Sequence, residues 1–199
     1  MTIIGLTGNP GTGKSTVAAM FQKLGAAVFD SDRAVHDLLE RKGACYRAVV
    51  REFGERILNE DKGIDRRKLA EVVFNDGRAR KKLERIVHPY VGRAMSRWVA
   101  RPEIHRKKVA VMEVPLLFEA GFDKWVDGIV VVRANRSQQI ARLKGRLGLS
   151  RREALSRIAA QMPLKEKIRR ADYVVDNRSS RDAARQQVLN IWKELTGGK

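Results

Sequence analysis

Cysteine, aromatic residues and long apolar stretches are all scarce in this chain of 199 residues. Cys45 is the only cysteine, which excludes an intramolecular disulfide and any zinc site built from several cysteines, and which is typical of the reducing cytosol. No run of about 18 apolar residues occurs, so we expect neither a membrane-spanning helix nor a membrane partner. No basic segment precedes the apolar start "MTIIGLTG", so we expect no secretory signal and a cytoplasmic location.

Acidic residues are few beside the basic ones, 23 against 41, and the formal net charge is +18. The excess is concentrated in residues 78–108 and 136–170, each of which holds 11 basic and 2 acidic residues. Such surfaces indicate polyanionic partners, which are either nucleic acid or highly phosphorylated small molecules. Because aromatic residues make up only 6% and form no stacking pattern, we expect no specific nucleic-acid partner.

Apolar stretches that read as strands alternate with helical patterns along the chain. We expect strands in residues 2–8, 26–30, 107–114, 127–134 and 171–177, with helical spacing between them and a capping box at Ser150 and Glu153. This alternation predicts an α/β fold with a central parallel sheet between two layers of helices. We expect a single domain with a core in residues 1–30 and 106–199, a helical insertion at about 31–105, and a lid at about 137–160.

The segment "GNPGTGKST", residues 8–16, has the full phosphate-binding pattern of a P-loop between an apolar strand and an amphipathic helix. Glycines let the backbone curl so that its amides point at phosphate oxygens, and the following helix adds its positive end. Lys14 can reach the β- and γ-phosphates, and Ser15 can bind magnesium. We therefore expect ATP or GTP to contact the loop residues Gly8, Gly11, Thr12, Gly13, Lys14, Ser15 and Thr16.

Three carboxylates follow predicted strands on the side of the sheet where the loop lies. Glu113 is a candidate magnesium ligand beside Ser15, and Asp30 and Asp32 are further candidates. Asp30 and Asp32 are two residues apart, so in an extended chain both would point to one face. Asp32 is the preferred general base for an attacking hydroxyl, and the alternative is that both residues only cap a helix.

The basic stretch 136–170 provides the predicted lid. Arg142 and Arg146 are four residues apart and share a helical face, so both can bind the triphosphate and stabilise the transferring phosphoryl group. Gly145 and Gly148 provide points of flexibility for a lid that excludes water. The histidines form no cluster with other ligands, so we expect no structural metal site, and Pro89 should kink or end the helix around His88.

The motifs together resemble the dephospho-coenzyme A kinase family nearly end to end. The resemblance rests on the P-loop and, more specifically, on the ordered stretches "VFDSD", "GIDRRKLAEVVF", "IVHPYV", "VPLLFEAG" and "QMPLKEKIRRADYVVDN". It implies a P-loop NTPase fold and the ATP-dependent phosphorylation of the ribose 3′-hydroxyl of dephospho-coenzyme A, with Mg²⁺. It also implies Asp32 and Lys14 as catalytic residues, Arg142 as the lid arginine, Asn177 near the adenine of ATP, and His88 near the coenzyme in the insertion.

The chain departs from this family's usual pattern at two places. Asn9 and Pro10 replace the small residues common in the loop, and Pro10 removes one N–H donor from it. Glu113 stands where aspartate is frequent, which affects the expected magnesium geometry. A nucleotide or nucleoside kinase and a nucleic-acid-stimulated NTPase remain alternatives. The sequence is compatible with a monomer or a small homo-oligomer.

Overall fold

The computed structural model describes residues 1–198, without the side chains of residues 74 and 75. The chain forms two compact units. The first contains Met1–Asp30 and the residues from Trp98 onward, and the second contains Ser31–Arg97.

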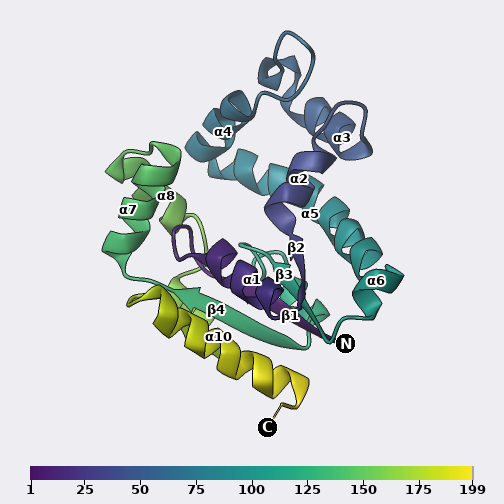
Figure 1. The fold of residues 1–199 in the computed structure, drawn as a ribbon. Helices are drawn as coiled ribbons and strands as arrows, with labels where there is room; N and C mark the ends of the chain where they lie inside the picture. The colour runs from purple at the N-terminus through teal and green to yellow at the C-terminus, as the bar shows by residue number, and fades with distance from the viewer. Residues whose placement is uncertain (199) are drawn as a thin grey trace. The chain divides into compact units, whose positions relative to one another are not determined.

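The first unit is built on a parallel sheet of five strands in the order β2-β3-β1-β4-β5 (Figure 1). The strands are β1 (Thr2–Thr7), β2 (Ala27–Asp30), β3 (Val109–Glu113), β4 (Gly128–Arg133) and β5 (Tyr173–Asp176). β1 is the central strand and pairs with β3 on one side and β4 on the other. The predicted parallel sheet is therefore confirmed, and the loop after β1 leaves from its middle.

Helices α1 (Lys14–Lys23) and α10 (Arg181–Thr196) pack side by side on one face of this sheet (Figure 1). Phe21 of α1 and Val188 of α10 are completely buried in the same cluster as Val130 of β4. Each such side chain contributes about 1.5–3 kcal/mol to stability when it leaves water. Leu117, in the segment after β3, lies against Gly5 of β1, and α9 (Leu164–Arg169) contacts β4.

The segment that the sequence predicts as a lid folds into two helices, α7 (Arg136–Leu147) and α8 (Arg151–Ala159), which a small apolar cluster of Leu143, Ala154 and Ile158 holds together. The capping box predicted at α8 is confirmed, because the Ser150 hydroxyl accepts from the Glu153 amide while the Glu153 carboxylate accepts from the Ser150 amide. α7 ends at Gly148, whose φ of 65° is left-handed.

The second unit contains α2 (Ser31–Leu38), α3 (Ala44–Phe53), the short 3₁₀ helix η1 (Glu55–Ile57), α4 (Arg66–Asn75) and most of α5 (Gly77–Val99). Val49, Phe53 and Ile57 are buried in it. The Asp65 carboxylate caps α4 by accepting from the amides of Arg67 and Lys68.

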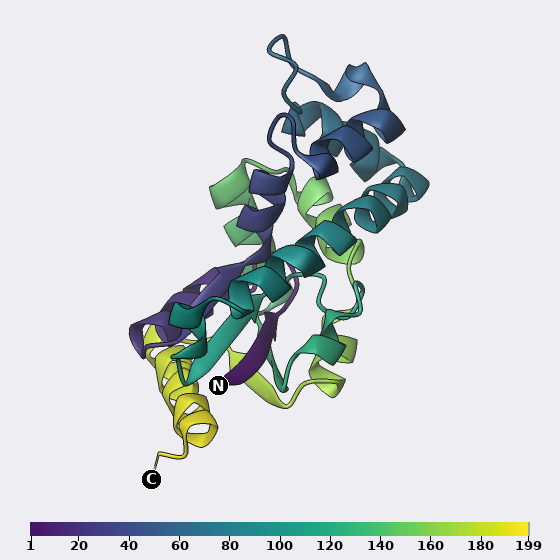
Figure 2. The ribbon, with the colours of Figure 1, turned by 90° about the vertical axis from the view of Figure 1, so that its right-hand side faces the viewer.

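The long helix α5 passes from the second unit into the first, where Trp98 packs against Phe29 of β2 at 5.5 Å between ring centroids. It is followed by α6 (Pro102–His105), and Figure 2 shows the chain running from α5 through α6 into β3. Pro89 was expected to kink or end the helix, and the helix does not end there, because α5 continues through Pro89 to Val99. A proline in a helix removes one hydrogen bond, and a helix of 23 residues retains the bonds on either side. Within residues 1–198, no helix combines the length and apolarity needed to cross a membrane.

Candidate functional site: a phosphate loop with a lid arginine

The loop between β1 and α1 requires glycine at its bends. Gly8, Gly11 and Gly13 have φ angles of 150°, 78° and 97°, which other residues rarely adopt. A Cβ atom on Gly8 would lie 2.5 Å from the Val132 carbonyl oxygen, and one on Gly11 would lie 2.6 Å from the Gln139 carbonyl oxygen. The loop is thus pressed against β4 and α7, and its curl is imposed by both backbone angle and contact.

Asn177, directly after β5, closes the other side of the loop. Its Nδ2 donates to the Thr12 carbonyl oxygen at 2.8 Å, and a Cβ atom on Gly13 would lie 2.3 Å from that nitrogen. The buried Thr12 hydroxyl donates to the Asn9 carbonyl oxygen at 2.9 Å. Thr12 therefore contributes its side chain to the shape of the loop.

The Lys14 ammonium group folds back over the loop. Its Nζ donates to the carbonyl oxygens of Gly8 at 3.0 Å and Asn9 at 3.4 Å. Lys14 is the first residue of α1, so the same position also receives the positive end of the helix. Backbone N–H groups and an ammonium group suit an incoming phosphate, whose oxygens can replace these carbonyl oxygens as acceptors.

Arg142 of α7 reaches the loop from the lid. Its Nη1 donates to the carbonyl oxygens of Gly11 and Thr12, both at 3.1 Å, and its Nη2 donates to the Asn177 carbonyl oxygen at 3.3 Å. Arg146 lies one turn further along α7 and is exposed. The structure thus brings Arg142, Asn177 and the loop together, as the sequence predicted for an ATP site.

The carboxylate of Asp176, the residue before Asn177, is bound by two arginines. Arg178 donates from Nε and Nη2 to the Asp176 carboxylate, and Arg133 donates to it from Nη2 at 2.7 Å. These bonds, those from Arg178 first, hold the pKa of Asp176 well below its ordinary value of 3.8. The carboxylate therefore stays ionised and keeps the end of β5 fixed beside the loop.

Ser15 and Glu113 form an oxygen pair at the carboxyl ends of the strands. The Ser15 hydroxyl donates to Glu113 Oε1 at 2.8 Å, and Glu113 is 7% exposed. Glu113 ends β3 in register with Leu6 of β1 and with Asp30 of β2. A hydroxyl and carboxylates are the hard oxygen donors that Mg²⁺ prefers, so this donor set fits the metal expected from the sequence.

Asp32, His88 and Thr16 are placed as follows. Thr16 is exposed in the first turn of α1. Asp32 is exposed in the first turn of α2, because the chain becomes helical at Ser31. The expected extended geometry of Asp30 and Asp32 is therefore wrong, and the two do not share a face through alternation. His88 is half-buried in α5 of the second unit.

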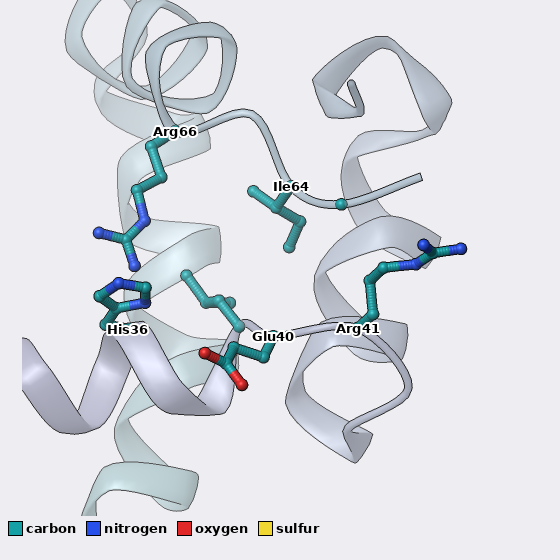
Figure 3. Close-up of a pocket in the computed structure, with 7 residues that line it drawn as sticks. His36, Glu40, Arg41, Ile64 and Arg66 are labelled. Carbon is teal, nitrogen blue, oxygen red and sulfur yellow. The ribbon is translucent and has the colours of Figure 1, made fainter. Parts of the chain in front are cut away.

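The second unit contains a pocket of about 430 Å³ that sequence reasoning missed (Figure 3). Its wall combines basic and apolar groups with one carboxylate, that of Glu40, and is formed by His36, Leu39, Glu40, Arg41, Gly63, Ile64 and Arg66. We call it the 36–66 pocket. In Figure 3 the Arg66 guanidinium, from the start of α4, points toward the His36 ring on α2. The stretch "GIDRR" supplies Gly63, Ile64 and Arg66 to this pocket, but only the tertiary structure brings them to the same wall as His36.

Lys167 was also missed. It is completely buried, donates from Nζ to the Pro115 carbonyl oxygen at 2.7 Å, and pairs with Glu119 Oε1 at 3.2 Å. Burial lowers the pKa of Lys167, and the Glu119 carboxylate partly offsets this. In the sequence, Lys167 is one of many lysines in a basic helical segment, and nothing there marks it as buried.

Comparison with known proteins identifies relatives along the whole chain. Residues 2–183 match the family model of dephospho-CoA kinase. The chain is 46% identical to a dephospho-CoA kinase of Symbiobacterium thermophilum over 199 residues, which are 100% of this chain and 83% of that one. It is 43% identical to a dephospho-CoA kinase of Geobacillus kaustophilus, with 96% and 95% of the two chains covered.

Solved structures agree with this comparison. A dephospho-CoA kinase from Campylobacter jejuni has a TM-score of 0.70 and 27% identity, with 98% of each chain covered. A shikimate kinase from Acinetobacter baumannii shares the fold, with a TM-score of 0.56, 18% identity, and 100% of this chain and 95% of that one covered. The predicted P-loop NTPase fold is thereby confirmed.

Proposed function

The chain belongs to the dephospho-CoA kinase family, and we propose that its phosphate loop, lid arginine and Asp32 transfer the γ-phosphoryl group of ATP to the ribose 3′-hydroxyl of dephospho-CoA. The family catalyses this ATP-dependent phosphorylation, the final step of CoA biosynthesis. The observation that carries the proposal is the convergence of Arg142, Asn177 and the P-loop around one carbonyl, that of Thr12.

ATP binds with its β- and γ-phosphates in the loop and its adenine near Asn177. Lys14 exchanges its contacts with Gly8 and Asn9 for phosphate oxygens. Arg142 exchanges its carbonyl partners in the same way, and Arg146 approaches the phosphates when the lid closes. Because phosphoryl transfer needs little covalent chemistry from the protein, positioning and charge stabilisation by these cations supply most of the catalysis.

Mg²⁺ is the metal that accompanies ATP, and Ser15 with Glu113 would hold it. The ion would neutralise charge on the β- and γ-phosphates. Asp30 lies opposite Glu113 in the β2–β3 register, so it adds negative charge that favours a cation at this edge.

Asp32 accepts the proton of the attacking hydroxyl. Chain connectivity keeps the Cα of Asp32 within about 7 Å of the Cα of Asp30, because two residues span no more than that. Asp30 ends β2 in register with Glu113, and Asp32 follows it by two residues along the chain. A carboxylate there can act as general base for an alcohol, as the catalytic aspartate of a kinase does.

The insertion, residues 31–97, binds the acceptor. Arg41, Arg66 and His36 give the 36–66 pocket donors for a phosphate ester, while Leu39 and Ile64 give it an apolar wall. Dephospho-CoA combines a diphosphate with a pantetheine arm, so both halves of this lining have a use. His88, in the same unit, is a further candidate contact. We place the reaction in the cytoplasm, where ATP and a reduced Cys45 are both expected.

Purified protein with ATP and Mg²⁺ tests the proposal against a panel of acceptors. With dephospho-CoA as acceptor, CoA, identified by mass, and ADP should form. With nucleoside monophosphates no ADP should be released, because ADP release there would indicate a nucleotide kinase. RNA should not stimulate ATP hydrolysis, as it would in a nucleic-acid-dependent NTPase. Arg66→Ala should raise the KM of dephospho-CoA about tenfold and leave the KM of ATP unchanged, since a charged hydrogen bond contributes about 1.5–3 kcal/mol.

A further inference from the structure

A closed series of hydrogen bonds surrounds the start of the phosphate loop. The Thr7 hydroxyl donates to the Pro115 carbonyl oxygen at 3.1 Å, and Lys167 Nζ donates to the same oxygen at 2.7 Å. Lys167 also pairs with Glu119, whose Oε1 accepts from the Met162 amide at 2.8 Å. We call this group of residues, together with Asn9, the Lys167 ring.

Asn9 completes the ring from the loop itself. Its Nδ2 donates to the Met162 carbonyl oxygen at 3.2 Å and, more weakly, to that of Ile158 at 3.5 Å. Thr7 and Asn9 flank Gly8, so both ends of the series meet at the first residue of the loop. Thr7 is completely buried, and Asn9 is 2% exposed.

The ring joins three parts of the site that lie far apart in sequence. Pro115 follows Glu113 by two residues, so its carbonyl fixes the chain just after the proposed magnesium ligand. Met162 lies between α8 and α9, where the lid returns to the core. Thr7 and Asn9 belong to the loop. All of these residues lie in the first unit.

Lys167 is the member that binds the ring together. An ammonium group that is completely removed from water needs a partner for its charge and acceptors for its protons. Glu119 supplies the charge, and the Pro115 carbonyl oxygen accepts the shorter contact, 2.7 Å against 3.2 Å. Through these contacts, Lys167 fixes the distance between Pro115, in the segment after β3, and Met162, in the segment between α8 and α9.

We propose that Lys167, through Pro115, Glu119 and Asn9, is a positioning residue for phosphoryl transfer, which keeps the phosphate loop, the Glu113 end of β3 and the base of the lid in one alignment. The inference rests on the proposed function and adds to it a residue that does not touch ATP. Because a displacement of about 1 Å can reduce a rate about a hundredfold, loss of the ring should lower kcat more than it changes binding.

The test separates alignment from fold stability. Lys167→Met leaves Glu119 without its charge partner, so the variant should unfold at a lower temperature and have a lower kcat. The double variant Lys167→Met/Glu119→Leu removes both charges, and replacing a buried pair by apolar residues of similar volume is often neutral for stability. Its thermal midpoint should return toward that of the unmodified protein, while kcat stays at least about tenfold lower and the KM of ATP changes less than about threefold.

Lys165→Met on the same helix is the control, because Lys165 is exposed. This variant should change neither the thermal midpoint nor kcat. A double variant whose kcat recovers together with its thermal midpoint would show that the ring only stabilises the fold, and would overturn the proposal. A second readout needs no acceptor and therefore does not depend on the proposed function. The amide NMR signals of Gly11 and Gly13 with bound ADP should move in the double variant, and signals that match those of the unmodified protein would also overturn it.

Discussion

The hydroxyl of Ser15, in the first turn of α1, donates to Glu113 Oε1 at the end of β3 across 2.8 Å. The two residues are 98 positions apart in sequence. Helix and strand thus present two hard oxygen donors at one point, and the carboxylate is almost completely buried. The magnesium dependence proposed above can therefore be tested by substituting a single residue.

Glu113→Gln should raise the Mg²⁺ concentration that gives half-maximal activity by about tenfold, because the amide lacks the negative charge that holds the ion. The measurement is the rate of ADP formation against Mg²⁺ at fixed ATP. Glu103→Gln, an exposed position on α6, should leave the curve in place. An unchanged curve for Glu113→Gln would remove this residue from the metal site.

Asp32→Asn should retain ATP binding and lose at least about a hundredfold in kcat, which is the size expected for the loss of general-base help. Nucleotide affinity by calorimetry and turnover with dephospho-CoA measure the two effects separately. Asp37→Asn, an exposed carboxylate on the same helix, serves as the matched control. Turnover close to normal in Asp32→Asn would mean that another group takes the proton.

Arg142→Ala should lower kcat about a hundredfold, because a preorganised donor to the transferring group is lost. Arg142→Lys should recover little of this rate, since one ammonium group cannot reproduce the planar fork that now reaches Gly11, Thr12 and Asn177. Lys144→Ala, on the exposed side of α7, controls for loss of charge in the lid. Equal rates for the alanine and lysine variants of Arg142 would agree with this account, whereas full activity of either would contradict it.

The depressed pKa of Asp176 predicts a specific acid sensitivity. Its pKa is lower in the folded chain than the ordinary value of 3.8, so its ion pairs contribute stability that is fully present above that value. The contribution is lost as the pH falls below it toward the pKa of the folded state. Urea unfolding at pH 6 and pH 3 should therefore show a smaller loss of stability on acidification for Asp176→Asn than for the unmodified protein. Equal losses would show that Arg133 and Arg178 do not stabilise the carboxylate.

Local patterns sufficed to predict the strands, the P-loop and the two helices of the segment 137–160. Each of these rests on neighbours in sequence, such as the glycines before Lys14 or the Ser150 capping box. Helical spacing singled out Arg142 and the family resemblance added Asn177, and both side chains donate to the Thr12 carbonyl oxygen. Their assigned roles in catalysis remain predictions.

Features that depend on tertiary contact could not be read from the sequence. Lys167 looks like its exposed neighbour Lys165, and only the packing of α9 against β4 distinguishes the two. Asp32 was expected to point to the same face as Asp30 in an extended chain. Because β2 ends at Asp30 and α2 begins at Ser31, Asp32 lies in a helix instead. The sequence also could not decide whether Pro89 ends its helix, because a long helix with hydrogen bonds on both sides of the proline tolerates it.

The central place of β1 has a consequence for how nucleotide can be exchanged. Its amides are bonded between β3 and β4, so they should be among the last in the chain to exchange with deuterium. The curved segment that follows it has few such bonds and is built around glycines. A nucleotide bound at that segment can therefore be exchanged while the strand before it stays bonded to both neighbours, so nucleotide exchange would not require the sheet to open.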